Sequence, residues 1–200
     1  MKKIVVIGAS GTLGKAVVDN LAGRHEVIRV GKTHGEFQVD ITIPESVQAL
    51  FGRLGKVDGI ISTTGQMFFG PVTQMRAEDF AIGLNDKLLG QVRLALVGQH
   101  YLNDGGSITL TSGILSDQPI HAGANASSVN AALDGFVRAA AVELGRGLRI
   151  NAVSPTVVQE SWGAYGPFFP GFEAVSAARV ALAYQRSVEG PQTGQVYRVW

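Results

Sequence analysis

Residues 1–14 read MKKIVVIGASGTLG, and this stretch decides the fold. Its apolar run, Ile4 to Ile7, is short and continuous, as is typical of a strand buried on both faces of a parallel sheet. Glycines follow at positions 8, 11 and 14, and apolar residues recur with helical spacing from Thr12 to Leu21. The glycines therefore lie at a turn from strand to helix, where bare backbone can approach a phosphate at the helix N-terminus.

Strand-like and helix-like segments alternate through the rest of the chain. Apolar spacing predicts strands at 25–30, 37–39, 57–61, 107–111, 149–153 and 195–199, and helices at 45–54, 77–102, 125–144 and 174–187. A segment rich in glycine, proline and aromatic residues, 160–172, is predicted to be a loop or lid. This alternation indicates an α/β fold with one doubly wound parallel sheet of about seven strands and helices on both faces. Because no linker or repeat interrupts them, residues 1–200 are expected to form a single domain.

The composition excludes several classes of protein. The chain has 200 residues and a net charge of +1, which does not resemble a nucleic-acid-binding protein. It contains no cysteine, so disulfides, thiolate metal sites and cysteine nucleophiles are excluded, and no metal site is expected. The glycines interrupt the first apolar run too early for a signal peptide, and no later stretch has the length of a membrane span. We therefore expect a cytoplasmic protein with no nucleic-acid or membrane partner.

A series of short motifs follows the glycine turn in a specific order. They are VDIT with Asp40, the turn Ser62-Thr63-Thr64-Gly65, Asn85 in a long helix, GGSITLTSG with Ser112, VNAALDGFVRAAAVELGRGLRINAVSP, and GQVYRV. In this order the motifs resemble the short-chain dehydrogenase/reductase family across nearly the whole chain. The resemblance implies a Rossmann fold that binds a nicotinamide dinucleotide and a small-molecule substrate.

The chain departs from the family in its catalytic helix. The family carries Tyr-x-x-x-Lys there: the tyrosine donates a proton to the substrate oxygen, and the lysine binds the nicotinamide ribose and lowers the tyrosine pKa. With the sequences aligned on Ala131-Ala132-Leu133, Ala126 stands at the tyrosine position and Asn130 at the lysine position. Asn130 can hydrogen-bond a ribose hydroxyl but supplies no charge, and Ala126 supplies no proton. We therefore interpret the chain as a divergent member that lacks the catalytic pair.

The cofactor site implied by the resemblance surrounds the glycine turn. The second predicted strand ends without the carboxylate that would bind the ribose 2′-hydroxyl of NAD. Lys32 stands there instead and resembles the basic residue that accepts the 2′-phosphate in NADP-using relatives; a solvated loop lysine is the alternative. We therefore favour NADP(H) over NAD(H). The candidate cofactor-binding residues are Gly8, Ser10, Gly11, Thr12, Leu13, Gly14, Lys32, Asp40, Ile41, Ser62, Thr63, Thr64, Gly65, Asn130 and Pro155.

Four side chains are candidates for the catalytic site, namely Ser112, Asn85, Asn130 and His121. Ser112 follows the carboxyl end of a strand, where ligands of open α/β sheets bind, and could orient a substrate oxygen. Each of three residues also has a non-catalytic explanation. Ser112 could hydrogen-bond the backbone of its turn, Asn85 could lie on an exposed helix face, and His121 could be solvated. Lys87 lies two residues after Asn85, about 200° around a helix, which makes it a poorer candidate than Asn85.

Two functions remain open from the sequence. The first is an NADP(H)-dependent oxidoreductase that transfers hydride between nicotinamide and a small carbonyl or alcohol, with non-standard acid–base residues. The alternative is a catalytically silent NADP(H)-binding sensor or scaffold, while a flavin or S-adenosylmethionine enzyme fits the motifs less well. Segments 77–102 and 125–144 occupy the places of the helices that pair subunits in the family, which implies a homodimer or homotetramer.

Overall fold

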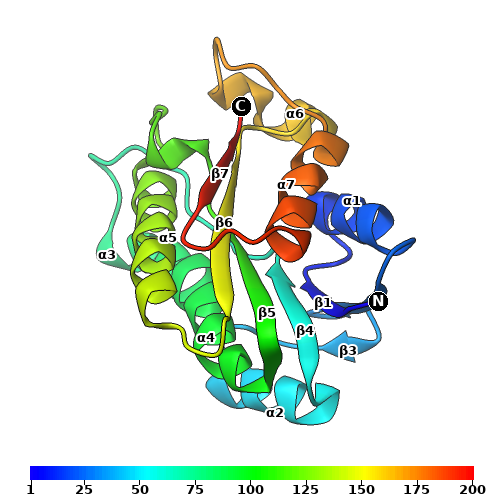
Figure 1. The fold of residues 1–200 in the computed structure, drawn as a ribbon. Coiled ribbons are helices and arrows are strands. Elements are labelled where there is room, and N and C mark those ends of the chain that lie inside the picture. The colour runs from blue at the N-terminus through cyan, green and yellow to red at the C-terminus, as the bar shows by residue number, and fades with distance from the viewer.

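The computed structural model describes residues 1–200 and contains one sheet of seven parallel strands (Figure 1). Their order across the sheet is β3-β2-β1-β4-β5-β6-β7, and every neighbouring pair runs parallel. The predicted doubly wound parallel sheet is therefore confirmed. The strands are β1 (Lys3–Ile7), β2 (Glu26–Gly31), β3 (Phe37–Gln38), β4 (Val57–Ser62), β5 (Leu102–Thr111), β6 (Arg149–Pro155) and β7 (Val196–Val199).

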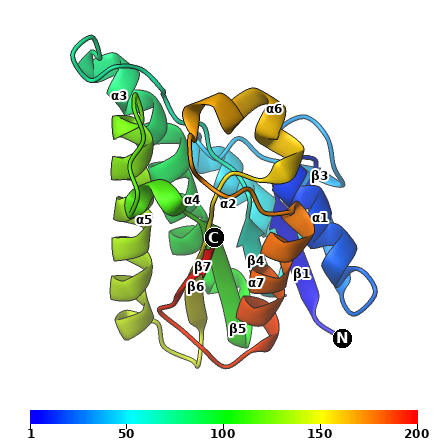
Figure 2. The same ribbon diagram turned by 90° about the horizontal axis from the view of Figure 1, so that it is seen from above.

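Helices cover both faces of the sheet (Figure 2). On one face α1 (Thr12–Leu21) packs beside α7 (Ala177–Glu189). The other face is covered by α2 (Pro44–Leu54), α4 (Leu89–Gly98) and α5 (Ala124–Glu143). The central strand β1 is buried under helices on both sides and is a continuous apolar run, as its sequence indicated.

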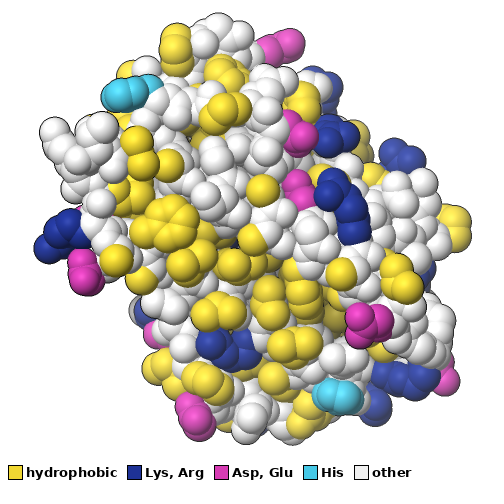
Figure 3. Space-filling model, turned by 90° about the vertical axis from the view of Figure 1, so that its left-hand side faces the viewer, with side chains coloured by type: hydrophobic (Ala, Val, Ile, Leu, Met, Phe, Trp, Pro, Cys, Tyr) yellow, Lys and Arg dark blue, Asp and Glu magenta, His cyan; other side chains and the backbone are white.

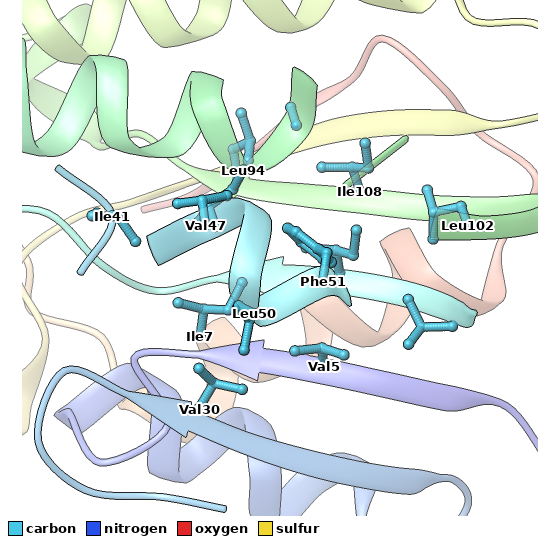
Figure 4. Close-up of a cluster of buried hydrophobic side chains, with 14 of the residues drawn as sticks. Val5, Ile7, Val30, Ile41, Val47, Leu50, Phe51, Leu94, Leu102 and Ile108 are labelled. Atoms are coloured by element: carbon cyan, nitrogen blue, oxygen red, sulfur yellow. The ribbon is translucent and has the colours of Figure 1, made fainter. Parts of the chain in front are cut away.

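The larger core lies between the sheet and the second group of helices. In Figure 4, Leu50 and Phe51 of α2 lie over Ile7 and Val5 of β1, and Ile108 of β5 belongs to the same buried cluster. Burial of such side chains stabilises a fold by roughly 1.5–3 kcal/mol each. This core holds the ends of β1 and β5 in fixed positions, and both ends contribute to the site described below.

The strand order reverses between β1 and β4, which places a crevice at their carboxyl ends. The two strands pair in register, with Ile7 opposite Ser62. The residues that follow them, Gly8 on one side and Thr63 on the other, are therefore neighbours. The predicted glycine turn and the predicted Ser62–Gly65 turn meet at this point.

The long helix predicted at 77–102 is interrupted in the structure. It consists of α3 (Ala77–Gly83), a π-helical turn (Leu84–Leu88), α4 and a 3₁₀ turn (Gln99–Tyr101). Leu102, predicted to end the helix, instead begins β5, where it is fully buried opposite Val57 of β4. The prediction was wrong at this end because Leu102 continues the helical spacing of apolar residues, while its burial is decided by the sheet.

The last third of the chain differs from the prediction in two places. Helix α7 spans Ala177–Glu189, whereas the predicted helix spans 174–187. Its start is set by the N-cap Ser176, whose hydroxyl accepts a hydrogen bond from Arg179 N at 3.2 Å. The segment predicted as a loop or lid contains the short helix α6 (Trp162–Tyr165), which lies above the carboxyl ends of the strands in Figure 2. None of the helices combines the length and the apolar character needed to cross a membrane.

Candidate functional site

The glycine turn brings backbone, without side chains, to the start of α1. Gly8 has φ +89° and lies so close to the next strand's turn that a Cβ on it would be 2.8 Å from Thr63 Oγ1. A Cβ on Gly14 would be 2.0 Å from Gly8 O, so this glycine permits close packing of α1 against the turn. Gly11 is the N-cap of α1 and supplies no side-chain cap. The first N–H groups of the helix therefore lack a capping side chain and suit a phosphate.

A hollow of about 310 Å³ opens between the glycine turn and the ends of β2 and β4. Lys32 and Asp40 face each other in it, with Lys32 Nζ 2.8 Å from Asp40 Oδ2. Lys32 and the hydrogen bonds from Thr42 lower the pKa of Asp40 to about 2. The lysine side chain is 69% exposed. Lys32 is thus near the glycine turn, as predicted, but its charge is already paired with a carboxylate.

The Ser62–Gly65 turn joins this hollow to a second one. Thr63 N donates to Ile7 O at 2.8 Å, and Thr63 Oγ1 donates to Gly8 O at 3.2 Å, which ties the two turns together. Ser62 Oγ and Thr64 Oγ1 share a hydrogen bond of 2.8 Å within the turn. Gly65 has φ +122° and lines both hollows.

The second hollow is a pocket of about 680 Å³ at the carboxyl ends of β5 and β6, below α6. Its volume is within the range of small-molecule sites. Thr12 and Leu13 at the start of α1 line its inner end, next to the glycine turn. The sequence-predicted residues in its wall include Ser112, Asn130 and Pro155. The structure therefore brings these three together beside the predicted phosphate turn.

Three residues in the wall of this pocket have a buried polar atom without a hydrogen-bond partner. Ser112 N donates to Val153 O at 2.9 Å, so its backbone is satisfied, but Ser112 Oγ makes no hydrogen bond. Asn130 Oδ1 and Thr156 Oγ1 are also buried without a partner. Buried polar atoms normally have partners, so these three point to a ligand or ordered water in the pocket.

The two positions aligned with the catalytic pair differ in their surroundings. Ala126 is fully buried and packs in a small apolar cluster with Ile114, Leu115, Val157 and Phe169. Asn130, one turn further along α5, reaches the pocket wall, and a Cβ on Gly113 would be 2.9 Å from Asn130 Nδ2. The absence of a side chain at Gly113 therefore makes room for the Asn130 amide.

Lys87 enters the pocket from the π-helical turn before α4. It is 6% exposed, and Lys87 Nζ donates to Ser112 O at 3.0 Å. Burial lowers its pKa to about 8, an effect that the charge of Asp134 partly opposes. Asn85, in contrast, is exposed and does not line the pocket. The residue of this turn that lines the pocket is therefore Lys87, whereas the sequence favoured Asn85.

Two other residues bear on the predictions. His121 is exposed and is not part of the pocket wall, so the structure does not bring it to Ser112. Asn125, which the sequence analysis did not single out, is fully buried at the start of α5. Its amide accepts from Phe68 N at 2.8 Å and donates to Phe80 O at 2.7 Å. Asn125 thereby fixes the loop that carries Met67 and Phe69 into the pocket.

Gln91 of α4 holds the end of β5 in place. Its side chain is fully buried, donates to Thr111 O at 2.9 Å and accepts from Thr111 N at 2.8 Å. No signal in the sequence indicated this role, because the burial of Gln91 is visible only in the structure; a glutamine is rarely buried without partners. The amide supplies the hydrogen bonds that β4 does not make to Thr111, and so positions the adjacent Ser112.

Comparison with known proteins agrees with this geometry. Residues 3–196 match the family described as enoyl-(acyl carrier protein) reductase. The crystal structure of the protein lin1944 from Listeria innocua is 48% identical and covers all of both chains with a TM-score of 0.99. A small-chain dehydrogenase crystallised in complex with NADPH is 27% identical over 98% of this chain and 95% of its own, with a TM-score of 0.88.

A relative from Mycobacterium tuberculosis, an uncharacterized oxidoreductase, is 28% identical over 186 residues. The match covers 80% of this chain and 68% of that protein's length. The matches, the seven-stranded parallel sheet and the glycine turn at its switch point all lead to one conclusion. The chain belongs to the short-chain dehydrogenase/reductase family.

Proposed function

We propose that the protein is an NADP(H)-dependent oxidoreductase that transfers hydride between the nicotinamide and a small carbonyl or alcohol. The observation that carries this proposal is the continuity of the two hollows across the glycine turn. The 310 Å³ hollow and the 680 Å³ pocket share Gly65 and Gln66, and the start of α1 lies between them. A dinucleotide has this extended shape, with a charged pyrophosphate at its centre.

The residues present fit such a cofactor. The uncapped start of α1 would hold the pyrophosphate, and the hollow of Asp40 and Ile41 would hold the adenosine. Asn130 Oδ1, buried and without a partner, would accept a hydrogen bond from a ribose hydroxyl. When bound, the nicotinamide would supply or accept the hydride. The similarity to a dehydrogenase crystallised with NADPH supports this assignment.

The preference for NADP(H) depends on Lys32. Its ammonium is the cation at the end of β2, where the ribose 2′-substituent would lie. The ion pair with Asp40 works against this preference, because a 2′-phosphate would compete with the carboxylate for the same ammonium. The side chain is largely exposed and flexible enough to turn toward a phosphate while staying near Asp40.

The pocket favours a substrate with an apolar body and one polar end. Met67, Phe69, Ile82 and Phe169 supply apolar surface, and Ser112 and Asn130 supply polar groups at the inner wall. Ala126 cannot donate a proton, and Asn130 cannot carry charge. The acid–base chemistry is therefore non-standard if the protein turns over.

Two measurements test the proposal. NADPH fluorescence titrated with protein should saturate, and absence of binding at millimolar cofactor would refute cofactor binding. A panel of aldehydes and ketones followed at the nicotinamide absorbance should then give turnover with at least one apolar carbonyl. A bound cofactor without turnover of any panel member would instead support the second candidate, a silent sensor or scaffold, which the residues Ala126 and Asn130 favour.

We also propose that the protein is a homodimer or homotetramer. Figure 3 shows hydrophobic side chains gathered on the side of the molecule that carries α3 and α5. Leu96 of α4 is 52% exposed and Val142 of α5 is 86% exposed, and a groove between these helices is lined mostly by apolar residues. Exposed apolar surface of this kind is typical of subunit contacts. Light scattering coupled to size-exclusion chromatography should give a mass of two or four chains.

A further inference from the structure

Lys87 is the one cationic side chain in the wall of the larger pocket, and the fold fixes its position. The π-helical turn Leu84–Leu88 inserts it between α3 and α4, and π-helical turns frequently occur at functional sites. Its stem packs against Gly65, where a Cβ would be 2.6 Å from Lys87 Cβ. Gly65 has φ +122°, so glycine is favoured at that position for two independent reasons.

The ammonium of Lys87 has unused hydrogen-bonding capacity. Lys87 Nζ donates one hydrogen bond, to Ser112 O, so two of its three N–H groups lack a protein partner. Leaving such donors unpaired in a buried site is costly. The polar atoms without partners nearby, Ser112 Oγ and Asn130 Oδ1, lie in the wall of the same pocket. A ligand oxygen in the pocket would satisfy the free donors.

The titratable groups around Lys87 come from three elements. Asp134 of α5 is 4% exposed, and burial raises its pKa, an effect that the charge of Arg138 partly opposes. Asp86, on the same turn as Lys87, accepts from Gln66 N at 2.9 Å and is thereby held at the surface loop. Tyr165 of α6 is the other titratable residue in the pocket wall and is 48% exposed.

We propose that Lys87 is the proton donor of this pocket and that it takes the place of the family's tyrosine from a different helix. This inference rests on the proposed function. In the reduction, the carbonyl carbon gains the hydride, the electron pair of the C=O π bond moves to oxygen, and Lys87 Nζ gives that oxygen a proton. The product is an alcohol, and Lys87 becomes a neutral amine that regains a proton from water. In the oxidation the same amine accepts the alcohol proton.

The properties of the side chain suit this role. An efficient acid–base group has a pKa close to the working pH. Burial brings the pKa of Lys87 to about 8, so the amine can both give and regain a proton near neutrality. Ala126 has no proton to give, Asn130 does not titrate, and His121 is outside the pocket.

Three variants test the role through kinetics. Lys87→Met has a similar volume and no proton, Lys87→Arg keeps the charge but does not titrate in the useful range, and Lys56→Met removes an exposed lysine elsewhere. Both Lys87 variants should lose roughly 100-fold or more in kcat with KM changed less, while Lys56→Met stays within about twofold of wild type. Activity retained by Lys87→Arg, or lost equally by Tyr165→Phe, would overturn the proposal.

A second readout does not depend on turnover. Competitive acetylation of the cofactor-free protein at a series of pH values, followed by peptide mass spectrometry, gives the pKa of each lysine. Lys87 should titrate near 8, well below the ordinary lysine value. A Lys87 pKa above 10 would overturn the proton-donor role whatever the kinetics show.

These experiments distinguish a failure of the proposed function from a failure of the role assigned to Lys87. Wild-type protein that binds NADPH but reduces no carbonyl would refute the proposed function, and the Lys87 role with it. Wild-type protein that turns over, while Lys87→Met does so at the same rate, would refute only the role of Lys87. NADPH titration of Lys87→Met, expected to give a Kd within about threefold of wild type, shows that any lost activity does not come from a lost cofactor.

Discussion

Replacing Lys87 with methionine should change the pH dependence of stability in a defined way. In the folded protein, burial lowers the pKa of this lysine to about 8, whereas the unfolded chain keeps the ordinary value of 10.5. Between these two pH values the unfolded state binds more protons than the folded state. The wild-type free energy of unfolding therefore gains a contribution from Lys87 as the pH rises, and the methionine variant lacks that contribution.

The size of the effect follows from the pKa difference. Each unit of pKa shift corresponds to about 1.4 kcal/mol, so the full shift is worth about 3 kcal/mol. Between pH 7 and pH 9.5 the linkage relation gives about 2 kcal/mol of that total. The methionine variant also loses the hydrogen bond to Ser112 O and gains apolar contact, but those changes do not depend on pH. The advantage of the variant over wild type should thus shrink by about 2 kcal/mol across this interval.

Urea unfolding of the two proteins without cofactor, followed by circular dichroism at several pH values, measures this difference. Other titrating groups, including Tyr184, whose pKa burial raises, occur in both proteins and cancel from the comparison. Lys56→Met serves as the matched control, because it makes the same substitution at an exposed lysine. A difference between wild type and Lys87→Met that stays constant from pH 7 to pH 9.5 would refute the assignment of Lys87 as a desolvated ammonium.

Three further predictions concern the cofactor site and the surface. Lys32→Ala should weaken NADPH binding about three- to tenfold and leave NADH binding nearly unchanged in fluorescence titrations, because the side chain is exposed and already shared with Asp40; equal effects on both cofactors would remove the NADP(H) preference. Gly14→Ala should lower the free energy of unfolding by about 2–3 kcal/mol, since its Cβ would lie 2.0 Å from Gly8 O, and wild-type stability in urea unfolding would contradict this close packing. Val142→Lys should shift the mass in light scattering toward one chain, whereas Val72→Lys, at another exposed valine, should not; a single-chain mass for the wild type would refute the proposed assembly.

Local sequence patterns were sufficient to predict the sheet. The run Ile4–Ile7 forms the buried centre of β1, and Gly8 has the positive φ that the turn requires. The helical spacing from Thr12 to Leu21 matches α1 at both ends. Patterns of this kind succeed because a strand under two layers of helices must be apolar throughout, and a helix over a sheet must be apolar on one side.

The same patterns were insufficient where tertiary contacts decide. The apolar spacing of 77–102 does not reveal the π-helical turn, which changes the direction in which the following side chains point. That Asn85 and Lys87 point in different directions was predictable, but which of them faces inward was not, because helical spacing alone does not show which side of the turn packs against the sheet. Likewise, the loop position of Lys32 was predictable, whereas its ion pair with Asp40 required the distance between two strand ends.

Lys87 affects which residues are compatible with position 130, the position aligned with the family's lysine. That lysine would come from α5 at position 130, and Lys87 already places an ammonium in the same pocket. Asn130→Lys on its own would put two ammonium groups in one buried pocket, and each would disfavour the charged form of the other. An uncharged amide at 130 avoids this conflict, and Gly113 makes room for that amide against the end of β5. The identities of residues 87, 113 and 130 are therefore coupled, and restoring the family's Tyr-x-x-x-Lys at 126 and 130 requires that Lys87 be neutralised as well.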